Sequence, residues 1–325
     1  MKPPRRRRRT ALLLLVLLAL AATGAGVVIG REDGEEDPRR PSVSVGQPES
    51  RARPGNEERE QVAQSVPPGI ELDDEDEVPL RFKRPPRAAL LLDVDSGEVL
   101  WSRKPLNPVP IASLTKVMTA LIVVDRIGPR AKTRISRSAT KFRGSGVGVL
   151  PRGKKVPVEA LLHGLLLPSG NDAAVALAEA VAGSDRRFAK LMTRRAQELG
   201  LGCTRFVDSY GLRAGNRSCA ADLAALTRLA MRQPRIARIV RLPHANVPFP
   251  IKGRRLDVRN TNPLLGRARY GGTIGLKTGY TERAGHCLIA VARRGDRTLA
   301  AILLNSPNTA VQAKRMLDAG FRAEY

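Results

Sequence analysis

The sequence predicts an α+β protein, with one antiparallel sheet built from both ends of the folded part and a helical insertion between them. Strand-like runs occupy residues 88–102, helical runs fill the middle of the chain, and three more strand-like runs lie near the end. Short runs rich in β-branched and apolar residues indicate strands, whereas apolar residues spaced three and four apart indicate helices. Strands segregated from helices along a chain are typical of α+β folds.

The first two strands form a hairpin. AALLLDV (88–94) and GEVLWS (97–102) are joined at Asp95-Ser96-Gly97, a turn signal. A helix is expected to begin at Ser113 and to run to about Asp125. Ser113 and Lys116 are three apart and would share one face of that helix.

Apolar periodicity and turn signals also predict the remaining helices and strands. Helical periodicity marks residues 158–167, 171–183, 185–200 and 220–233. Residues 243–270 are rich in turn signals and predict a short hairpin. The tail returns to strands at 275–281, 286–294 and 297–305, and an amphipathic helix over 309–321 follows.

The first 30 residues are predicted to be a signal peptide or an N-terminal membrane anchor. Lys2 and Arg5 to Arg9 precede an uncharged run from Thr10 to Gly30. That run is about the ~20 residues needed to span a bilayer, and the basic flank favours the cytoplasmic side. The anchor is slightly favoured over cleavage, and in both cases the remainder is expected to be extracytoplasmic.

Residues 31–86 are predicted to be a disordered linker. They contain nine prolines and runs such as EDGEED and ELDDEDE. Such a composition buries too little apolar surface to offset the loss of chain entropy. The folded domain is therefore expected to span residues 87–325.

Positive charge is concentrated in the expected domain, which holds 41 basic and 16 acidic residues. This excess indicates either a solvated arginine-rich surface or attraction to a polyanion, such as an anionic cell-wall polymer or a membrane surface. No nucleic acid partner is expected, because no nucleic-acid-binding motif is present and only 3% of residues are aromatic.

The three cysteines lack metal-ligand spacing. In an oxidising compartment Cys203 and Cys219 could close a disulfide, while Cys287 lies in an apolar run and is expected to be a buried free thiol. His163, His244 and His286 have no partner at suggestive spacing. The sequence therefore predicts no metal site and no organic cofactor.

Three short motifs occur in a fixed order. Ser113-x-x-Lys116 is followed 56 residues later by Ser169-Gly170-Asn171 and another 108 residues later by Lys277-Thr278-Gly279. An S-x-x-K, an S-x-N and a K-T-G in that order are the signature of penicillin-recognising active-site serine enzymes. Each motif alone is common, so their conjunction carries the prediction.

The chain from about residue 86 onward resembles the D-alanyl-D-alanine carboxypeptidases, the low-molecular-weight penicillin-binding proteins of peptidase family S11. ASLTKVMTAL, LLLPSGNDAAVALAEAVAGS, RAQELGLGCTRFVDSYGL and GLKTGYTERAGHCLIAVARRG carry the similarity. The resemblance implies a β-lactamase/transpeptidase-like fold. It also implies a substrate, the peptidoglycan stem peptide ending in D-Ala-D-Ala, and covalent inhibition by β-lactams.

The residue types fit this chemistry. A serine hydroxyl needs a neighbouring base, and a lysine among apolar groups can lose its proton through desolvation, so Lys116 is expected to activate Ser113. Following the family, Ser169 would relay a proton between Lys116 and the leaving amine, and Asn171 would hold the substrate. The backbone N–H groups of Ser113 and Tyr280 would form the oxyanion hole.

The strand motif supplies the remaining substrate contacts. Lys277 would place positive charge beside the terminal carboxylate, and Thr278 would donate a hydrogen bond to it. Gly279 would leave room for an extended peptide along the strand edge. One departure is Ile274, which occupies a position that is acidic in many family members.

Other functions remain open on sequence grounds. A D,D-endopeptidase that cuts peptidoglycan cross-links would use the same residues, and a non-catalytic wall-binding protein would need only the basic surface. A class A β-lactamase is disfavoured, because no E-x-x-x-N element lies between Asn171 and Lys277. Intact motif residues favour the carboxypeptidase.

Overall fold

The computed structural model describes residues 66–73, 75–142 and 144–323. In chain order these residues form β1 (Ala88–Asp93), β2 (Val99–Arg103), β3 (Val109–Pro110), η1 (Ala112–Thr115), α2 (Lys116–Arg126), β4 (Lys132–Arg134), α3 (Arg137–Lys141), β5 (Lys155–Pro157), α4 (Val158–Leu166), α5 (Asn171–Ala182), α6 (Asp185–Glu198), β6 (Arg217–Ser218), α7 (Ala220–Arg232), α8 (Pro234–Val240), β7 (His244–Pro248), β8 (Arg255–Arg259), η2 (Pro263–Leu265), β9 (Thr273–Thr281), β10 (Gly285–Arg294), β11 (Arg297–Leu304) and α9 (Thr309–Arg322).

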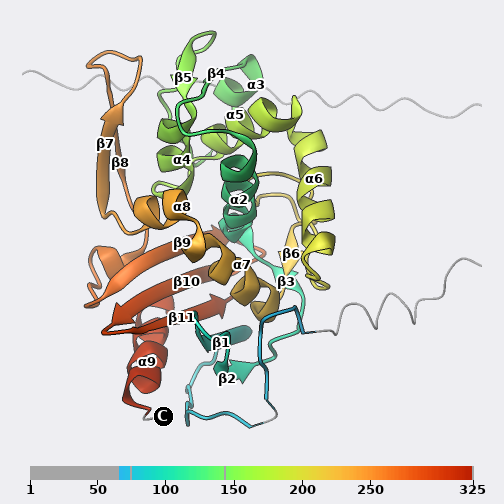
Figure 1. The fold of residues 1–325 in the computed structure, drawn as a ribbon, viewed down its shortest axis with the longest axis vertical. Helices are drawn as coiled ribbons and strands as arrows, with labels where there is room; N and C mark the ends of the chain where they lie inside the picture. Colours follow the sequence, from blue (N-terminus) through green and yellow to red (C-terminus); the bar gives the residue numbers. More distant parts are fainter. Residues whose placement is uncertain (1–65, 74, 143, 324–325) are drawn as a thin grey trace, which may run out of the picture. The chain divides into compact units, whose positions relative to one another are not determined.

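A five-stranded antiparallel sheet in the order β2-β1-β11-β10-β9 is the centre of the fold. It joins strands from both ends of the folded part, as the sequence predicts. Helix α9 packs on one face, and α7 and α8 pack on the other, where the helical insertion lies (Figure 1). The predicted fold class and its antiparallel sheet are confirmed.

The strand β1 is apolar from Ala88 to Leu92, up to its last residue Asp93, because both faces of the sheet are covered. Leu90 and Leu92 belong to the core shared with the helical insertion, whereas Ala89 and Leu91 belong to the core beneath α9. Alternate side chains of a strand point to opposite faces, so a strand buried on both sides needs no polar residues.

The predicted turns are present. Asp93 accepts hydrogen bonds from the backbone N–H groups of Asp95 and Ser96, and Gly97 adopts a φ of 101° that favours glycine. The hairpin predicted in the turn-rich region is formed by β7 and β8.

The predicted disordered linker needs correction for residues 66–73 and 75–86, which lie along β2. The backbone N–H of Glu71 donates to Gly97, and that of Val78 donates to Leu100. Ile70 and Val78 are buried, and the ring of Phe82 packs edge-on against Trp101. A few apolar residues cover an otherwise open sheet edge here, and the acidic composition around them hides this signal.

Residues 1–65 lie outside the described part of the chain, and with them the predicted signal peptide or anchor and the rest of the predicted linker. Within residues 66–73, 75–142 and 144–323, none of the helices has the length and apolar character required to cross a bilayer.

Candidate active site

Ser113 and Lys116 lie at the start of the helix that runs through the insertion. The sequence predicts a helix from Ser113, but the first turn is the 3-10 helix η1, and Lys116 is the first residue of α2. The two side chains still share one face, and Lys116 Nζ lies 2.8 Å from Ser113 Oγ. A serine and a potential base are therefore within hydrogen-bond reach.

Lys116 is completely buried, and its hydrogen-bond partners among the described residues are all neutral oxygens. Its Nζ lies 2.6 Å from Asn171 Oδ1 and 2.8 Å from the carbonyl oxygen of Tyr210, in addition to Ser113. Burial lowers the pKa of Lys116 well below its usual value, and the positive charge of Lys277 lowers it further. The charges of Asp208 and Asp172 act in the opposite direction.

A neutral amine fits these three contacts. It has two N–H donors for Asn171 and Tyr210, and its lone pair can accept the hydroxyl proton of Ser113. The arrangement can therefore take a proton from the serine without moving either side chain.

The carbonyl of Tyr210 is held in place by a buried aspartate. Asp208 accepts hydrogen bonds from the backbone N–H groups of Tyr210 at 3.0 Å, Gly211 at 2.5 Å and Arg213 at 2.8 Å. Gly211 has a φ of 91°, and a Cβ there would lie 2.0 Å from the carbonyl oxygen of Ala112. Sequence reasoning did not identify Asp208 or Tyr210 as site residues. The D-x-x-G pattern in VDSYGL is the available signal, since such turns favour aspartate and glycine.

The Ser169-Gly170-Asn171 loop differs in detail from the sequence prediction. Asn171 is the first residue of α5 and accepts a hydrogen bond from Lys116, and its expected role at the substrate stays a prediction. Ser169, expected beside Lys116, makes no hydrogen bond to it, and its buried Oγ has no hydrogen-bond partner among the described residues. Ser169 has a φ of 66°, which is uncommon for a residue with a side chain.

The third motif lies on β9, at the edge of the sheet. Lys277 is buried, and its Nζ donates to the carbonyl oxygen of Thr278 at 2.9 Å. Burial lowers the pKa of Lys277 to about 7. Thr278 is half-buried, and its hydroxyl oxygen lies 2.6 Å from that of Thr261.

Gly279 brings β9 against the serine. A Cβ at this position would lie 3.0 Å from the backbone nitrogen of Ser113 and 3.1 Å from the carbonyl oxygen of Ile111. A Cβ here would force the two backbones apart by a few tenths of an ångström, so glycine favours this close approach. Tyr280 follows, with an exposed side chain whose ring lies 4.5 Å from that of His286. The oxyanion roles of Ser113 and Tyr280 stay predictions.

The predicted disulfide between Cys203 and Cys219 is confirmed, and Cys287 is a buried free thiol, as expected. Among the described residues, Cys203, Cys219 and Asp222 are close enough to share a metal ion. The two sulfurs are bonded to each other, however, so this cluster offers no thiolate.

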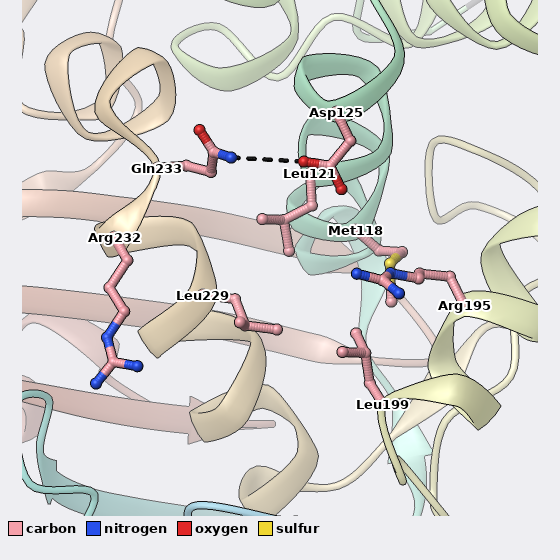
Figure 2. A pocket seen from close by; sticks show the side chains of 8 residues that line it. All are labelled: Met118, Leu121, Asp125, Arg195, Leu199, Leu229, Arg232 and Gln233. Atoms are coloured by element: carbon pink, nitrogen blue, oxygen red, sulfur yellow. Dashed lines mark hydrogen bonds between the residues drawn. The ribbon is translucent and has the colours of Figure 1, made fainter.

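A cavity of about 270 Å³ lies on a different face of α2 (Figure 2). Leu121, Leu199 and Leu229 point into it, and Gln233 donates a hydrogen bond to Asp125 at its rim. None of the motif residues lines this cavity. Met118, which does, is two residues after Lys116 and therefore on roughly the opposite side of the helix.

Comparison with known proteins agrees with this geometry. Residues 82–308 match the Peptidase_S11 family, described as D-alanyl-D-alanine carboxypeptidase. Mycobacterium tuberculosis D-alanyl-D-alanine carboxypeptidase DacB2 is 36% identical over 73% of this chain and 82% of its own length. A Pseudomonas aeruginosa D-alanyl-D-alanine endopeptidase is 34% identical over 70% of this chain and 72% of its own length.

Other relatives are longer or have known structures. Bacillus subtilis D-alanyl-D-alanine carboxypeptidase DacF is 32% identical over 72% of this chain, and the match spans 62% of DacF. The Streptomyces K15 DD-transpeptidase superposes with a TM-score of 0.70 at 28% identity, over 75% of this chain and all of that chain. The D-alanyl-D-alanine carboxypeptidase of Mycobacterium tuberculosis H37Rv gives 0.70 at 31% identity, over 80% of this chain and 97% of that one.

Family match, fold and motif geometry lead to one assignment. The chain belongs to the Peptidase_S11 family.

Proposed function

We propose that this protein is a serine D,D-carboxypeptidase that removes the terminal D-alanine from peptidoglycan stem peptides. The observation that carries the proposal is the buried Lys116, whose Nζ lies 2.8 Å from Ser113 Oγ and whose described hydrogen-bond partners are all neutral. A lysine in that setting has the lowered pKa that a general base requires.

The reaction would proceed through an acyl-enzyme. Ser113 Oγ bonds to the carbonyl carbon of the penultimate D-alanine while its proton passes to Lys116. The C–N bond then breaks, and the proton leaves with the amine of the terminal D-alanine. Water hydrolyses the ester with Lys116 again accepting a proton, which restores the serine.

The remaining motif residues would bind the substrate. Lys277 and Thr278 belong to β9, at the place where the terminal carboxylate would lie. Gly279 on the same strand allows a peptide to approach Ser113. Ser169 has a buried hydroxyl without a described partner, which is suited to bind the leaving amine. Asn171 would orient Lys116.

A D,D-endopeptidase is the second candidate, because a relative of that name is 34% identical. The two activities differ in how much peptide the cleft accepts beyond the scissile bond.

We further propose that the enzyme works outside the cytoplasmic membrane, with residues 1–30 as a signal peptide or anchor. Its excess positive charge would attract anionic wall polymers or the membrane surface.

The first experiment measures the intact mass of the full chain after incubation with a penicillin. We expect one covalent penicillin per wild-type chain and none on Ser113→Ala. An unmodified wild-type chain with intact secondary structure would refute the serine mechanism. Release of D-alanine from a pentapeptide, compared with cleavage of a cross-linked muropeptide dimer, then separates carboxypeptidase from endopeptidase.

A further inference from the structure

Residues 260–262, an Asn-Thr-Asn segment between β8 and η2, lie at the proposed substrate site although no motif includes them. The two asparagines fix the backbone of this segment. Asn260 Nδ2 donates to the carbonyl oxygens of Val240 and Leu242, both at 3.0 Å. Asn262 Nδ2 donates to the carbonyl oxygen of Gly275 at 2.8 Å. The residue between them is therefore held from both sides.

That residue, Thr261, connects two of the motif-bearing segments. Its backbone N–H donates to the carbonyl oxygen of Leu167 at 3.0 Å, two residues before Ser169. Its Oγ1 lies 2.6 Å from Thr278 Oγ1 on β9. Thr261 thus links the loop that carries Ser169 to the strand that carries Lys277.

The number of hydroxyl protons limits which threonine can donate in the Thr261–Thr278 hydrogen bond. Each threonine hydroxyl has one proton to donate. The Thr261 hydroxyl has two acceptors within reach, Thr278 Oγ1 at 2.6 Å and the carbonyl oxygen of Leu167 at 3.2 Å. When Thr261 donates to Leu167, the proton of Thr278 is drawn to Thr261. When Thr261 donates to Thr278, the Thr278 proton is free for a ligand.

A carboxylate selects the second arrangement, because it only accepts hydrogen bonds and strengthens those it receives. We propose that Thr261 is a positioning residue that directs the Thr278 hydroxyl toward the terminal carboxylate of the substrate. Thr261 acts through Thr278 and sets the preference for substrates with a free carboxyl end. This inference rests on the proposed function, in which Thr278 faces that carboxylate.

The test removes the Thr261 hydroxyl and keeps the shape of the side chain. Thr261 bonds a neutral hydroxyl, and a neutral hydrogen bond lost in this way raises KM by roughly 2- to 10-fold. We therefore expect Thr261→Val to raise KM for a peptide ending in D-Ala-D-Ala by about this factor with kcat nearly unchanged, and Thr261→Ser to restore KM. Thr273→Val removes a hydroxyl from the other end of β9 and serves as the matched control.

Penicillin acylation separates this inference from the proposed function. Thr261→Val should slow acylation by a penicillin but not by its methyl ester, which lacks the carboxylate. If wild type is acylated yet releases no D-alanine, the carboxypeptidase proposal fails and the penicillin comparison alone decides the role of Thr261. Equal slowing with acid and ester, no rescue by serine, or a wild type that is never acylated would overturn the inference.

Discussion

The two lysines of the candidate site are both buried but have different surroundings. Lys116, behind Ser113, has three oxygens within hydrogen-bond distance, contributed by Ser113, Asn171 and Tyr210. Lys277, on the edge strand, has one described hydrogen bond, to the carbonyl oxygen of Thr278. Burial lowers the pKa of both. Neither has a carboxylate among these partners.

The difference indicates different roles for the same residue type. The contacts of Lys116 are all filled by the protein, which holds its amine at the serine and suits it to proton transfer. Lys277 keeps donor capacity for a ligand, and an arriving carboxylate would stabilise its charged form. Substitutions and pH profiles can test whether the two lysines have these different roles.

Replacement of Lys116 should have the largest effect. Loss of a general base costs roughly 10²- to 10⁴-fold in rate, so Lys116→Met should slow penicillin acylation of Ser113 by about that factor. Time-resolved intact mass measures this rate. Lys190→Met, on the exposed side of α6, is the control and should acylate like wild type. A folded Lys116→Met chain that acylates at the wild-type rate would exclude Lys116 as the base.

A change at Gly279 tests the contact between the serine and the edge strand. The new methyl group in Gly279→Ala would lie 3.0 Å from the Ser113 nitrogen, so β9 and η1 must separate slightly. A displacement of about 1 Å can cost ~100-fold, and we expect a smaller loss, about tenfold, in kcat/KM. Gly271→Ala is the control, since its Cβ would meet nothing within 4 Å. Unchanged kcat/KM would mean that this close approach is unimportant.

The pH dependence of KM should show the smallest effect. Lys277 in the free protein is charged below a pKa of about 7 and becomes neutral as the pH rises through it. Charge-assisted hydrogen bonds are roughly twice as strong as neutral ones, so KM for a D-Ala-D-Ala peptide should rise about three- to tenfold above that pH. The same peptide with a C-terminal amide should show no such rise.

The acid limb of the pH profile of kcat tests the lowered pKa of Lys116. Because burial lowers the pKa of Lys116, kcat should reach its plateau at a pH well below the usual pKa of a lysine amine.

For the KM comparison, an equal rise with the acid and the amide peptide would contradict the assignment of Lys277 to carboxylate binding.

The sequence predicted the elements whose signals are local. The turn at Asp95-Ser96-Gly97, the hairpin at β7 and β8, and the order of the three motifs all depend on residue types at short spacing. The Cys203–Cys219 disulfide also spans a short separation of 16 residues. Here composition and periodicity carry enough information because neighbours along the chain determine the structure.

The sequence was less informative where distant segments meet. Residues 66–73 and 75–86 have the composition of a linker, but β2 offers them an edge to cover. The geometry at Lys116 favours Asn171 over Ser169, because the α5 start brings the amide rather than the hydroxyl to the buried amine. Thr261 contacts Thr278 from a segment whose backbone two asparagines anchor, and no sequence motif marks this contact.

Sequence patterns were therefore enough to predict the fold class and the motif serine and lysines, whereas they left the Cys203–Cys219 disulfide as a possibility that the structure confirms. Only the folded chain shows which oxygens surround each lysine. These surroundings suit Lys116 to proton transfer and Lys277 to binding a carboxylate. The physical reason is that desolvation and hydrogen-bond saturation depend on packing between segments up to about a hundred residues apart, such as Lys116 and Tyr210 with a separation of 94.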